Sequence, residues 1–308
     1  MGASLTVYIL RRLAWMAIVL FIIATASFFL MRFAPGGPFD KERTLPEAIE
    51  KNLRAKYHLD RPLAVQYIIY MGGLIRGDLG PSFKYRNRSV NTIIAQSFPI
   101  SLTLGIYALS LAFIVGVSAG TFAAVNKHSA LDYATMSITL LGISLPNFFL
   151  GLILLLLFCF ELPLFQAAGW GRPGQMVLPI LTLAAPFTAY IARLMRASML
   201  DVLSQPYIRT ARAKGLSEFQ VVSRHALKNA ITPIVSFMGP AAAAVLTGSI
   251  VIEKIFAIPG LGTHFVNAAL NRDYTLVMGT VLLYSFLLVL FNLAVDIVYS
   301  FIDPRVKL

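Results

Sequence analysis

Residues 207–234, YIRTARAKGLSEFQVVSRHALKNAITPI, form the longest polar stretch in the second half of an otherwise apolar chain. Ser204 and Pro206 suit the first turn of a short helix, because serine can cap that turn and proline needs no N–H there. Gly215 follows Lys214 where such a helix would end, since glycine readily adopts the left-handed conformation found after helices. A short helix that ends in a glycine turn is therefore predicted.

A second helix is predicted after this turn. Ser217 and Gln220 form a capping-box pattern, in which each side chain hydrogen-bonds the backbone of the other residue. Phe219, Val222 and Ala226 follow at spacings of three and four, which predicts that they share one side of the helix. The chain then enters an apolar run, so the second helix is predicted to lead into a membrane span.

Basic residues dominate this region, which contains only two acids, Asp201 and Glu218. The basic residues are Arg193, Arg196, Arg209, Arg212, Lys214, Arg224 and Lys228. One interpretation is a basic cytoplasmic loop that fixes membrane orientation. The other is a preformed docking element for a soluble partner.

The composition indicates an integral membrane protein. The chain has 308 residues, of which 57% are hydrophobic and 13% charged, and its mean hydropathy is +0.74. Several runs exceed the roughly 18 apolar residues that cross a bilayer as a helix. Six spans are predicted, at residues 8–31, 99–125, 133–160, 176–197, 230–252 and 276–301. Residues 64–75 are too short to cross, so they are predicted to form an interfacial or loop helix.

The first run is predicted to be a retained span, because it is too long for a signal peptide and no small-residue cleavage site follows it. Orientation is predicted from the basic residues of short loops. With the amino terminus inside, the outer short loops carry Arg172, Lys254 and Arg272. The inner side carries Arg11, Arg12, Lys127, the basic residues of the region 193–228, Arg305 and Lys307. Both termini are therefore predicted to be cytoplasmic.

The segment between the first two spans is predicted to be a structured outer loop. Thr44 and Glu47 form a capping-box pattern there. Ile49, Leu53 and Tyr57 then recur every four residues, which is typical of an amphipathic helix.

Inside the spans, most features point to helix packing. Gly116 and Gly120 form a small-xxx-small pair that lets helices approach closely. Four prolines are expected to bend or interrupt helices: Pro146, Pro179, Pro186 and Pro240. Asn147, Asn292 and Asp296 are polar residues within spans, where an ionisable group is a functional-site hypothesis by default. Because Asp296 lies near the inner end of its span, a salt bridge with an inner basic residue is favoured over a role in translocation.

The polar stretch resembles a known family. Arg209-Thr210-Ala211, followed by Gly215, resembles the EAA signature of ABC-importer permeases, with Arg209 in place of Glu, a departure common in the peptide and nickel branch. Residues 224–230 (RHALKNA) resemble the continuation of that signature. Other stretches are similar to the same branch: residues 32–38 (RFAPGGP), 77–83 (GDLGPSF), 258–262 (IPGLG) and 271–274 (NRDY). The resemblance covers essentially the whole chain and is closest to the first permease subunit of oligopeptide importers, the OppB type.

This resemblance implies an all-α integral membrane protein with six transmembrane helices, the type I ABC-importer permease fold and a structured outer loop. Residues 1–31 would be the first transmembrane helix and 32–98 the extracytoplasmic loop. Residues 97–300 would be a permease domain of five helices that contains a cytoplasmic coupling segment at 204–229. The expected location is the bacterial cytoplasmic membrane.

The resemblance also implies partners. These are a homologous second permease (OppC-like), two cytoplasmic ATP-binding subunits (OppD/OppF-like), an extracytoplasmic peptide-binding protein and the lipid bilayer. The residues expected to couple to the ATPases are Arg209, Thr210, Ala211, Arg212, Ala213, Lys214, Gly215, Leu216, Arg224 and His225. The small residues would fit a groove of the ATPase, while Arg209 and Arg212, three apart on one face, would reach its acidic groups.

No enzyme chemistry is predicted for the chain itself. Cys159 is the single cysteine, the histidines lack zinc-ligand spacing, and the sequence contains no Gly-rich phosphate loop. No catalytic residue, metal or cofactor is therefore expected. The basic charge is divided among loops, which argues against nucleic-acid binding. An ion-driven secondary transporter is the less favoured alternative, because internal repeats are not evident. Dipeptides, nickel, glutathione and murein peptides remain alternative substrates.

Overall fold

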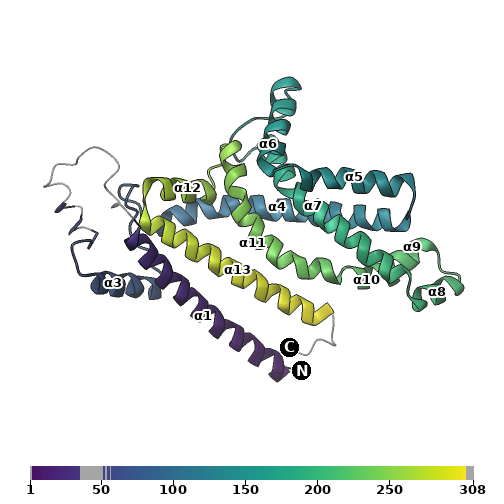
Figure 1. Cartoon of the computed structure of the whole chain (residues 1–308), viewed down its shortest axis with the longest axis horizontal. Coiled ribbons are helices and arrows are strands. Elements are labelled where there is room, and N and C mark those ends of the chain that lie inside the picture. Colours follow the sequence, from purple (N-terminus) through teal and green to yellow (C-terminus); the bar gives the residue numbers. More distant parts are fainter. Residues whose placement is uncertain (1, 35–50, 53, 56, 303–308) are drawn as a thin grey trace.

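Long apolar runs fold into helices in this chain, because a segment without access to water must satisfy its backbone hydrogen bonds internally. The structure, a computed structural model, describes residues 2–34, 51–52, 54–55 and 57–302 (Figure 1). The longer helices are α1 (Gly2–Phe33), α3 (Leu63–Ile75), α4 (Val90–Val125), α5 (Ala130–Ser144), α6 (Asn147–Leu155), α7 (Pro173–Leu203), α11 (Thr232–Ile255), α12 (Leu261–Asn271) and α13 (Tyr274–Ile302). The short helices are α8 (Pro206–Ala213), α9 (Glu218–Gln220) and α10 (Leu227–Ala230), and two π-helical turns lie at Leu156–Glu161 and Val221–Ala226.

The six predicted spans correspond to four single helices and two bent pairs. Among the described residues, α4, α7, Val7–Phe33 of α1 and Tyr274–Ile297 of α13 are each long and apolar enough to cross a membrane. The bent pairs are Ala130–Ser144 with Asn147–Glu161, at 103°, and Glu218–Ala230 with Thr232–Leu246, at 51°. The span predicted at residues 133–160 is therefore not one continuous helix.

Pro146 accounts for the sharper bend. It precedes α6, and Leu145 before it has an extended backbone with ψ at 132°, as the residue before proline prefers. By contrast, α7 continues through Pro179 and Pro186, and α11 continues through Pro240. The prediction that these prolines bend or interrupt helices is thus confirmed at Pro146, whereas the other three do not interrupt their helices, and a bend at those positions stays a prediction.

The most extensive helix contact among the described residues joins α4 and α7, and glycines let the two backbones approach closely. A Cβ on Gly120 would lie 2.4 Å from the Ala192 carbonyl oxygen, and one on Gly116 would lie 2.8 Å from Ile191 Cβ. Larger side chains at these positions would push the two backbones apart. The predicted packing role of this glycine pair is therefore confirmed.

The two ends of the helix bundle differ. Figure 1 shows α8, α9 and α10 beyond the end of α7, whereas α12 and α3 lie at the opposite end. The start of α1 and the end of α13 lie toward the α8 side. There, Arg12 Nη2 pairs with Asp296 Oδ2 at 2.7 Å, and the Tyr8 hydroxyl donates to the same oxygen at 3.0 Å. The predicted salt bridge of Asp296 is confirmed.

The helix predicted at residues 64–75 is α3, which packs against α1. Tyr70 stacks on Phe28 with ring centroids 5.5 Å apart, and Tyr67 contacts the same ring edge-on at 5.4 Å.

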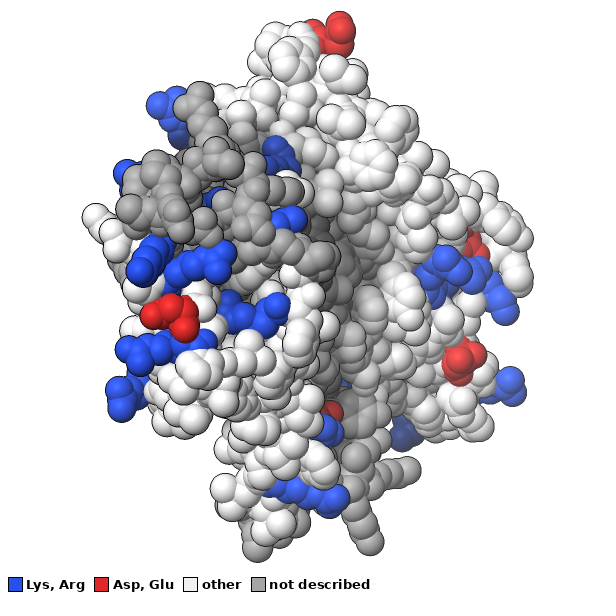
Figure 2. Space-filling view, turned by 60° about the vertical axis from the view of Figure 1, so that its left-hand side comes forward, with Lys and Arg blue, Asp and Glu red and all other residues white. Residues whose placement is uncertain are grey.

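Basic side chains gather beside the grey residues of Figure 2. The exposed basic residues of the segment before α4 are Lys51, Arg54, Arg61, Arg76, Arg86 and Arg88. The capping box predicted at Thr44 and Glu47 lies outside the described residues, as do Ile49 and Leu53.

Candidate coupling site

The short helix predicted at the start of the polar stretch is α8, which follows α7 after a two-residue connection. Pro206 occupies its first position, as predicted, but Gln205 rather than Ser204 precedes it. Ser204 instead ends α7, where its hydroxyl donates to the Asp201 carbonyl at 2.7 Å. The predicted cap at Ser204 is therefore wrong, because its hydroxyl bonds a carbonyl at the end of α7 and not an N–H at the start of α8.

One face of α8 packs against its own chain. Ile208 is fully buried and Ala211 is nearly so, and both belong to the main hydrophobic core. Asn229 Nδ2, at the end of α10, donates to the Tyr207 hydroxyl at 2.8 Å. These contacts hold α8 against the helix that follows it. The opposite face is exposed and comprises Arg209, Thr210, Arg212 and Ala213, continued by Lys214 and Gly215.

Gly215 makes the predicted turn after α8. Its φ is +82°, in the left-handed region that side chains disfavour, and its N–H donates to the Arg212 carbonyl at 2.9 Å. No atom lies within 4 Å of the position that a Cβ would occupy there. Glycine is therefore required at this position by backbone conformation and not by crowding.

Arg212 bridges the turn within the chain. Its Nε donates to Glu218 Oε1 at 2.7 Å and its Nη2 donates to Oε2 at 3.1 Å, which raises the pKa of Arg212. Both side chains remain exposed, at 41% and 61%, so this pair contributes little stability. Arg212 is thus paired with a carboxylate of its own chain, and its contact with a partner's acidic groups stays a prediction. Arg209 is exposed and makes no hydrogen bond or ion pair with the described residues.

The second predicted helix begins as expected. Ser217 N–H donates to Gln220 Oε1 at 3.2 Å and Gln220 N–H donates to Ser217 Oγ at 3.4 Å, which completes the capping box. The chain then forms a π-helical turn over Val221–Ala226 and continues into α10. The capping prediction is confirmed.

The packed side of this second helix differs from the prediction. Its buried residues Val221, Ala226 and Ala230 are five and four positions apart, and the spacing of five matches one π-helical turn. Phe219 therefore points away and is 80% exposed. The placement of Phe219 on the packed side is wrong, because the α-helical period does not hold here. Leu216 and His225 are half-buried and Arg224 is exposed.

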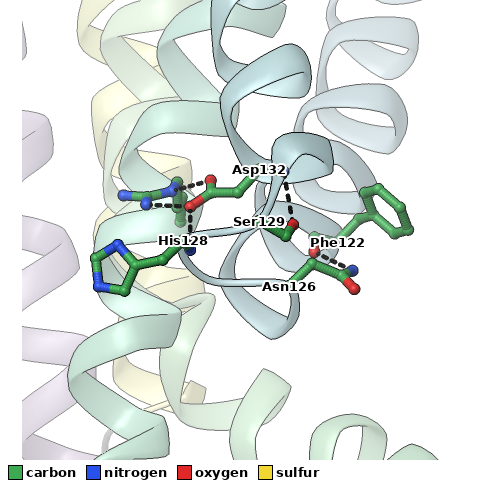
Figure 3. A network of polar contacts seen from close by, with 6 residues as sticks. Phe122, Asn126, His128, Ser129 and Asp132 are labelled. Atoms are coloured by element: carbon green, nitrogen blue, oxygen red, sulfur yellow. Dashed lines mark hydrogen bonds and ion pairs between the residues drawn. The ribbon is translucent and has the colours of Figure 1, made fainter.

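Sequence reasoning missed an ion pair that holds the end of α7. Asp132, 1% exposed at the start of α5, accepts hydrogen bonds from Arg196 Nε and Nη2, each 2.6 Å long. The backbone N–H of His128 donates to the same carboxylate at 3.1 Å (Figure 3). Arg196 lies seven residues before the end of α7. The connection from α4 to α5 is thus fixed to the segment from which α8 extends.

Two further carboxylates organise the opposite end of the molecule. Asp273 accepts hydrogen bonds from the Ser82 hydroxyl and from the Phe83 N–H, the latter at 3.1 Å, so residues 77–83 and 271–274 meet. Glu253 accepts from the Ser101 hydroxyl at 2.6 Å. A Cβ on Gly260 would lie 2.5 Å from this carboxylate, so glycine in the 258–262 turn leaves room for Glu253. Resemblance singled out the stretches that contain Asp273, Ser82 and Phe83, but no sequence signal indicated that these residues pair or that Glu253 meets Ser101, because the partners lie far apart along the chain.

The described part of the chain contains no group of three or more His, Cys, Asp or Glu residues that could hold a metal ion. The short helix α8 is packed against its own chain on one side and exposed on the other.

Comparisons with known proteins place the chain in a family. Residues 116–308 match the family described as binding-protein-dependent transport system inner membrane component, and residues 5–105 match the N-terminal part of such membrane components. The oligopeptide transport system permease protein OppB of Haemophilus influenzae is 47% identical over 302 residues, covering 97% of this chain and 99% of that protein. The dipeptide transport system permease protein DppB of Bacillus subtilis is 48% identical over 301 residues, covering 98% of each.

Solved structures show the same fold. An inward-facing MetNI methionine ABC transporter chain matches 68% of this chain and 96% of its own length, with a TM-score of 0.56 and 17% identity. A second crystal form of that transporter gives a TM-score of 0.59 and 18% identity. The predicted fold class is thereby confirmed, and the chain belongs to the family of binding-protein-dependent transport system inner membrane components.

Proposed function

We propose that this chain is the permease subunit that forms half of the translocation pathway for oligopeptides across the cytoplasmic membrane. The near-full-length similarity to proteins named OppB and DppB supports a peptide substrate. These two relatives are almost equally similar, so dipeptides stand as the alternative, followed by nickel, glutathione and murein peptides. ATP hydrolysis belongs to separate subunits.

The partners in this proposal are a homologous second permease (OppC-like), two cytoplasmic ATP-binding subunits (OppD/OppF-like) and an extracytoplasmic peptide-binding protein. Both termini and α8 face the cytoplasm. The proposed coupling segment is 204–229 within a permease domain at 97–300, preceded by a first span at 1–31 and an outer loop at 32–98.

The observation that carries the proposal is the two-sided character of α8. Ile208, Ala211 and the Tyr207 hydroxyl attach one face to the chain, whereas the Arg209 face is exposed. A short helix held in this way moves with α7 and α10, because its buried contacts leave it little independent freedom. A force that an ATPase applies to the exposed face would therefore be transmitted to the spans.

The residues proposed to contact or orient the ATPases are Arg209, Thr210, Ala211, Arg212, Ala213, Lys214, Gly215, Leu216, Arg224 and His225. Their roles differ. Arg209 would supply the free positive charge, while Arg212 would stabilise the turn through Glu218. Ala211 and Leu216 would orient the segment from the packed side, because Ala211 is buried and Leu216 packs against the core.

The test compares Gly215→Val with Gly171→Val. Both glycines have a positive φ, +82° and +109°, and both have open space where a Cβ would lie. Each substitution should therefore cost roughly 1 kcal/mol or somewhat more in backbone strain without a steric clash. Only Gly215 lies in the proposed coupling segment.

Gly215→Val should insert normally but lose ATPase co-purification and substrate transport in vesicles. Gly171→Val should stay close to the unsubstituted protein in both measurements. Full docking and transport by Gly215→Val would mean that the segment is only a charged loop, and the coupling proposal would be wrong.

A further inference from the structure

Arg32 is an unusual cation at the end of α1. Its Nε is buried, and the described residues offer it no hydrogen-bond acceptor. Its guanidinium lies over the Phe28 ring, 5.2 Å from the ring centroid, and no carboxylate of the described residues pairs with it. An unsatisfied charged donor is costly when it is removed from water, so an external acceptor would stabilise this arrangement.

A small cavity surrounds this cation. Its volume is about 270 Å³, and its lining includes Arg32, Gln66 and Tyr70. The Tyr70 hydroxyl and Gln66 Oε1 are likewise buried without a hydrogen-bond partner. Asp78 also contributes to the lining, but it is exposed, and its Oδ1 accepts from the Gly80 N–H at 2.9 Å. The Arg32 Nε–H and the Tyr70 hydroxyl, both without a partner, suit a phosphate oxygen, which accepts charge-assisted hydrogen bonds from arginine.

An apolar groove of about 890 Å³ lies beside this cavity, and Leu79 lines both. On α1 the cavity is lined by Phe28 and Arg32, whereas the groove is lined by residues 20–24. On α13 the cavity is lined by residues 275 and 278, and the groove by residues 279–286. At about 1.5 Å per residue, the groove residues of α1 lie about 12 to 18 Å from Arg32 along the helix, toward the middle of the span.

We propose that the cavity and groove together bind one glycerophospholipid, whose phosphate takes hydrogen bonds from Arg32 and Tyr70 and whose acyl chain lies along α1, α3 and α13. A cavity that contains unpaired polar groups at the end of two spans, beside an apolar groove that lies further along the same spans, has the polarity profile of such a molecule. A soluble anion or peptide would leave the groove unfilled. In the orientation given under the proposed function, this lipid belongs to the outer leaflet.

The test measures lipid retention by the purified full chain. The protein is reconstituted in vesicles of equal parts phosphatidylglycerol and digalactosyl diacylglycerol, a lipid with matched acyl chains but no phosphate, then extracted and analysed by native mass spectrometry. The chain should retain one phosphatidylglycerol in preference to the glycolipid. Arg32→Gln should lower that retention about tenfold, the effect of losing a charge-assisted hydrogen bond.

Two variants complete the design. Met71→Trp narrows the groove while leaving Arg32 in place, and it should reduce retention of both lipids. Arg61→Gln removes an exposed charge from the same end of the molecule and should change nothing. Equal retention of the two lipids, or a preference that survives Arg32→Gln, overturns the proposal. It is also overturned if Arg32→Gln leaves lipid retention intact but weakens co-purification of the second permease, because the cavity would then be a protein interface.

Discussion

The carboxylate of Asp132 accepts two hydrogen bonds from the guanidinium of Arg196, 64 residues later, and each bond is 2.6 Å long. The carboxylate is 1% exposed and the guanidinium side chain 26% exposed. This bidentate pair fixes the start of α5 against α7 close to the segment from which α8 extends. Among the ion pairs of the described residues, this one should therefore cost the most folding stability when it is removed.

Asp132→Asn is expected to destabilise the protein by about 3 kcal/mol, because Arg196 would lose its charged partner while remaining largely buried. The measurement is the thermal unfolding midpoint of the detergent-purified chain. Arg193→Gln is the control, since Arg193 is exposed on the same helix and its loss should stay within about 0.5 kcal/mol. Equal midpoints for the two variants would show that the Asp132 pair is not structurally important.

Gly120→Ala is expected to cost about 1–3 kcal/mol, because the added methyl would clash with the Ala192 carbonyl oxygen and Met195 Cβ of α7. Gly174→Ala is the matched control. It also lies in a helix, but nothing lies within 4 Å of its Cβ position, so it should be neutral or slightly stabilising. Unfolding midpoints that fall in the opposite order would refute the close α4–α7 contact.

Local signals in the sequence predicted the elements around α8 well. The position of Pro206, the glycine turn at Gly215 and the reciprocal cap of Ser217 with Gln220 depend on residues a few positions apart, so a single sequence contains the relevant information. Phe219 was misplaced because a π-helical turn changes the period of the buried side. No residue pattern distinguishes that turn from an α-helix in advance.

Contacts between distant segments were not predictable from one sequence. Glu253 accepts a hydrogen bond from Ser101, which is 152 residues away in the sequence. Asp273 accepts one from Phe83, at a separation of 190 residues. Their burial depends on how α4, α11 and α12 pack, which hydrophobic patterns alone do not specify. The partner of Asp296 could be anticipated as a class, an inner basic residue, because its position near the end of a span restricts the options. Its identity as Arg12 required the structure.

Asp273→Asn should release the loop before α4. The carboxylate accepts hydrogen bonds from Ser82, Phe83 and Thr275, and an amide would place a donor against some of these donors. A loss of about 2 kcal/mol is expected, together with faster trypsin cleavage at the exposed Arg86 and Arg88. Asp78→Asn, at an exposed aspartate of the preceding turn, should leave both cleavage rates unchanged. Cleavage of Asp273→Asn no faster than that of the unsubstituted protein would contradict the role of Asp273 in anchoring this loop.

Stability should fall in acid because of His264. Burial, and after it the positive charge of Arg88, lowers the pKa of His264 in the folded state. The unfolded chain therefore binds the proton more readily, so the folded state loses stability as pH drops below the ordinary histidine pKa of about 6.5. His264→Phe keeps an aromatic ring beside Tyr85 and removes the proton site, together with the 3.3 Å contact between Nδ1 and the Tyr85 hydroxyl. The variant should lose less stability than the unsubstituted protein between pH 7 and pH 5, and an identical pH profile would contradict this role of His264.

The proposed orientation can be tested with reporter fusions. Fusions after Asn126 and after Leu203 should report the cytoplasm, because basic residues follow both positions: Lys127 after the first, and the basic residues of α8 and its turn after the second. Fusions near Asn52 and Gly171 should report the outside. The structure adds a constraint: Gly171 lies just before α7 and Leu203 ends it, and α7 is long and apolar enough to cross a membrane, so the two fusions should report opposite sides. An external signal from the Leu203 fusion would place α8 where no ATP-binding subunit can reach it, and the coupling proposal would then be untenable whatever the chain transports.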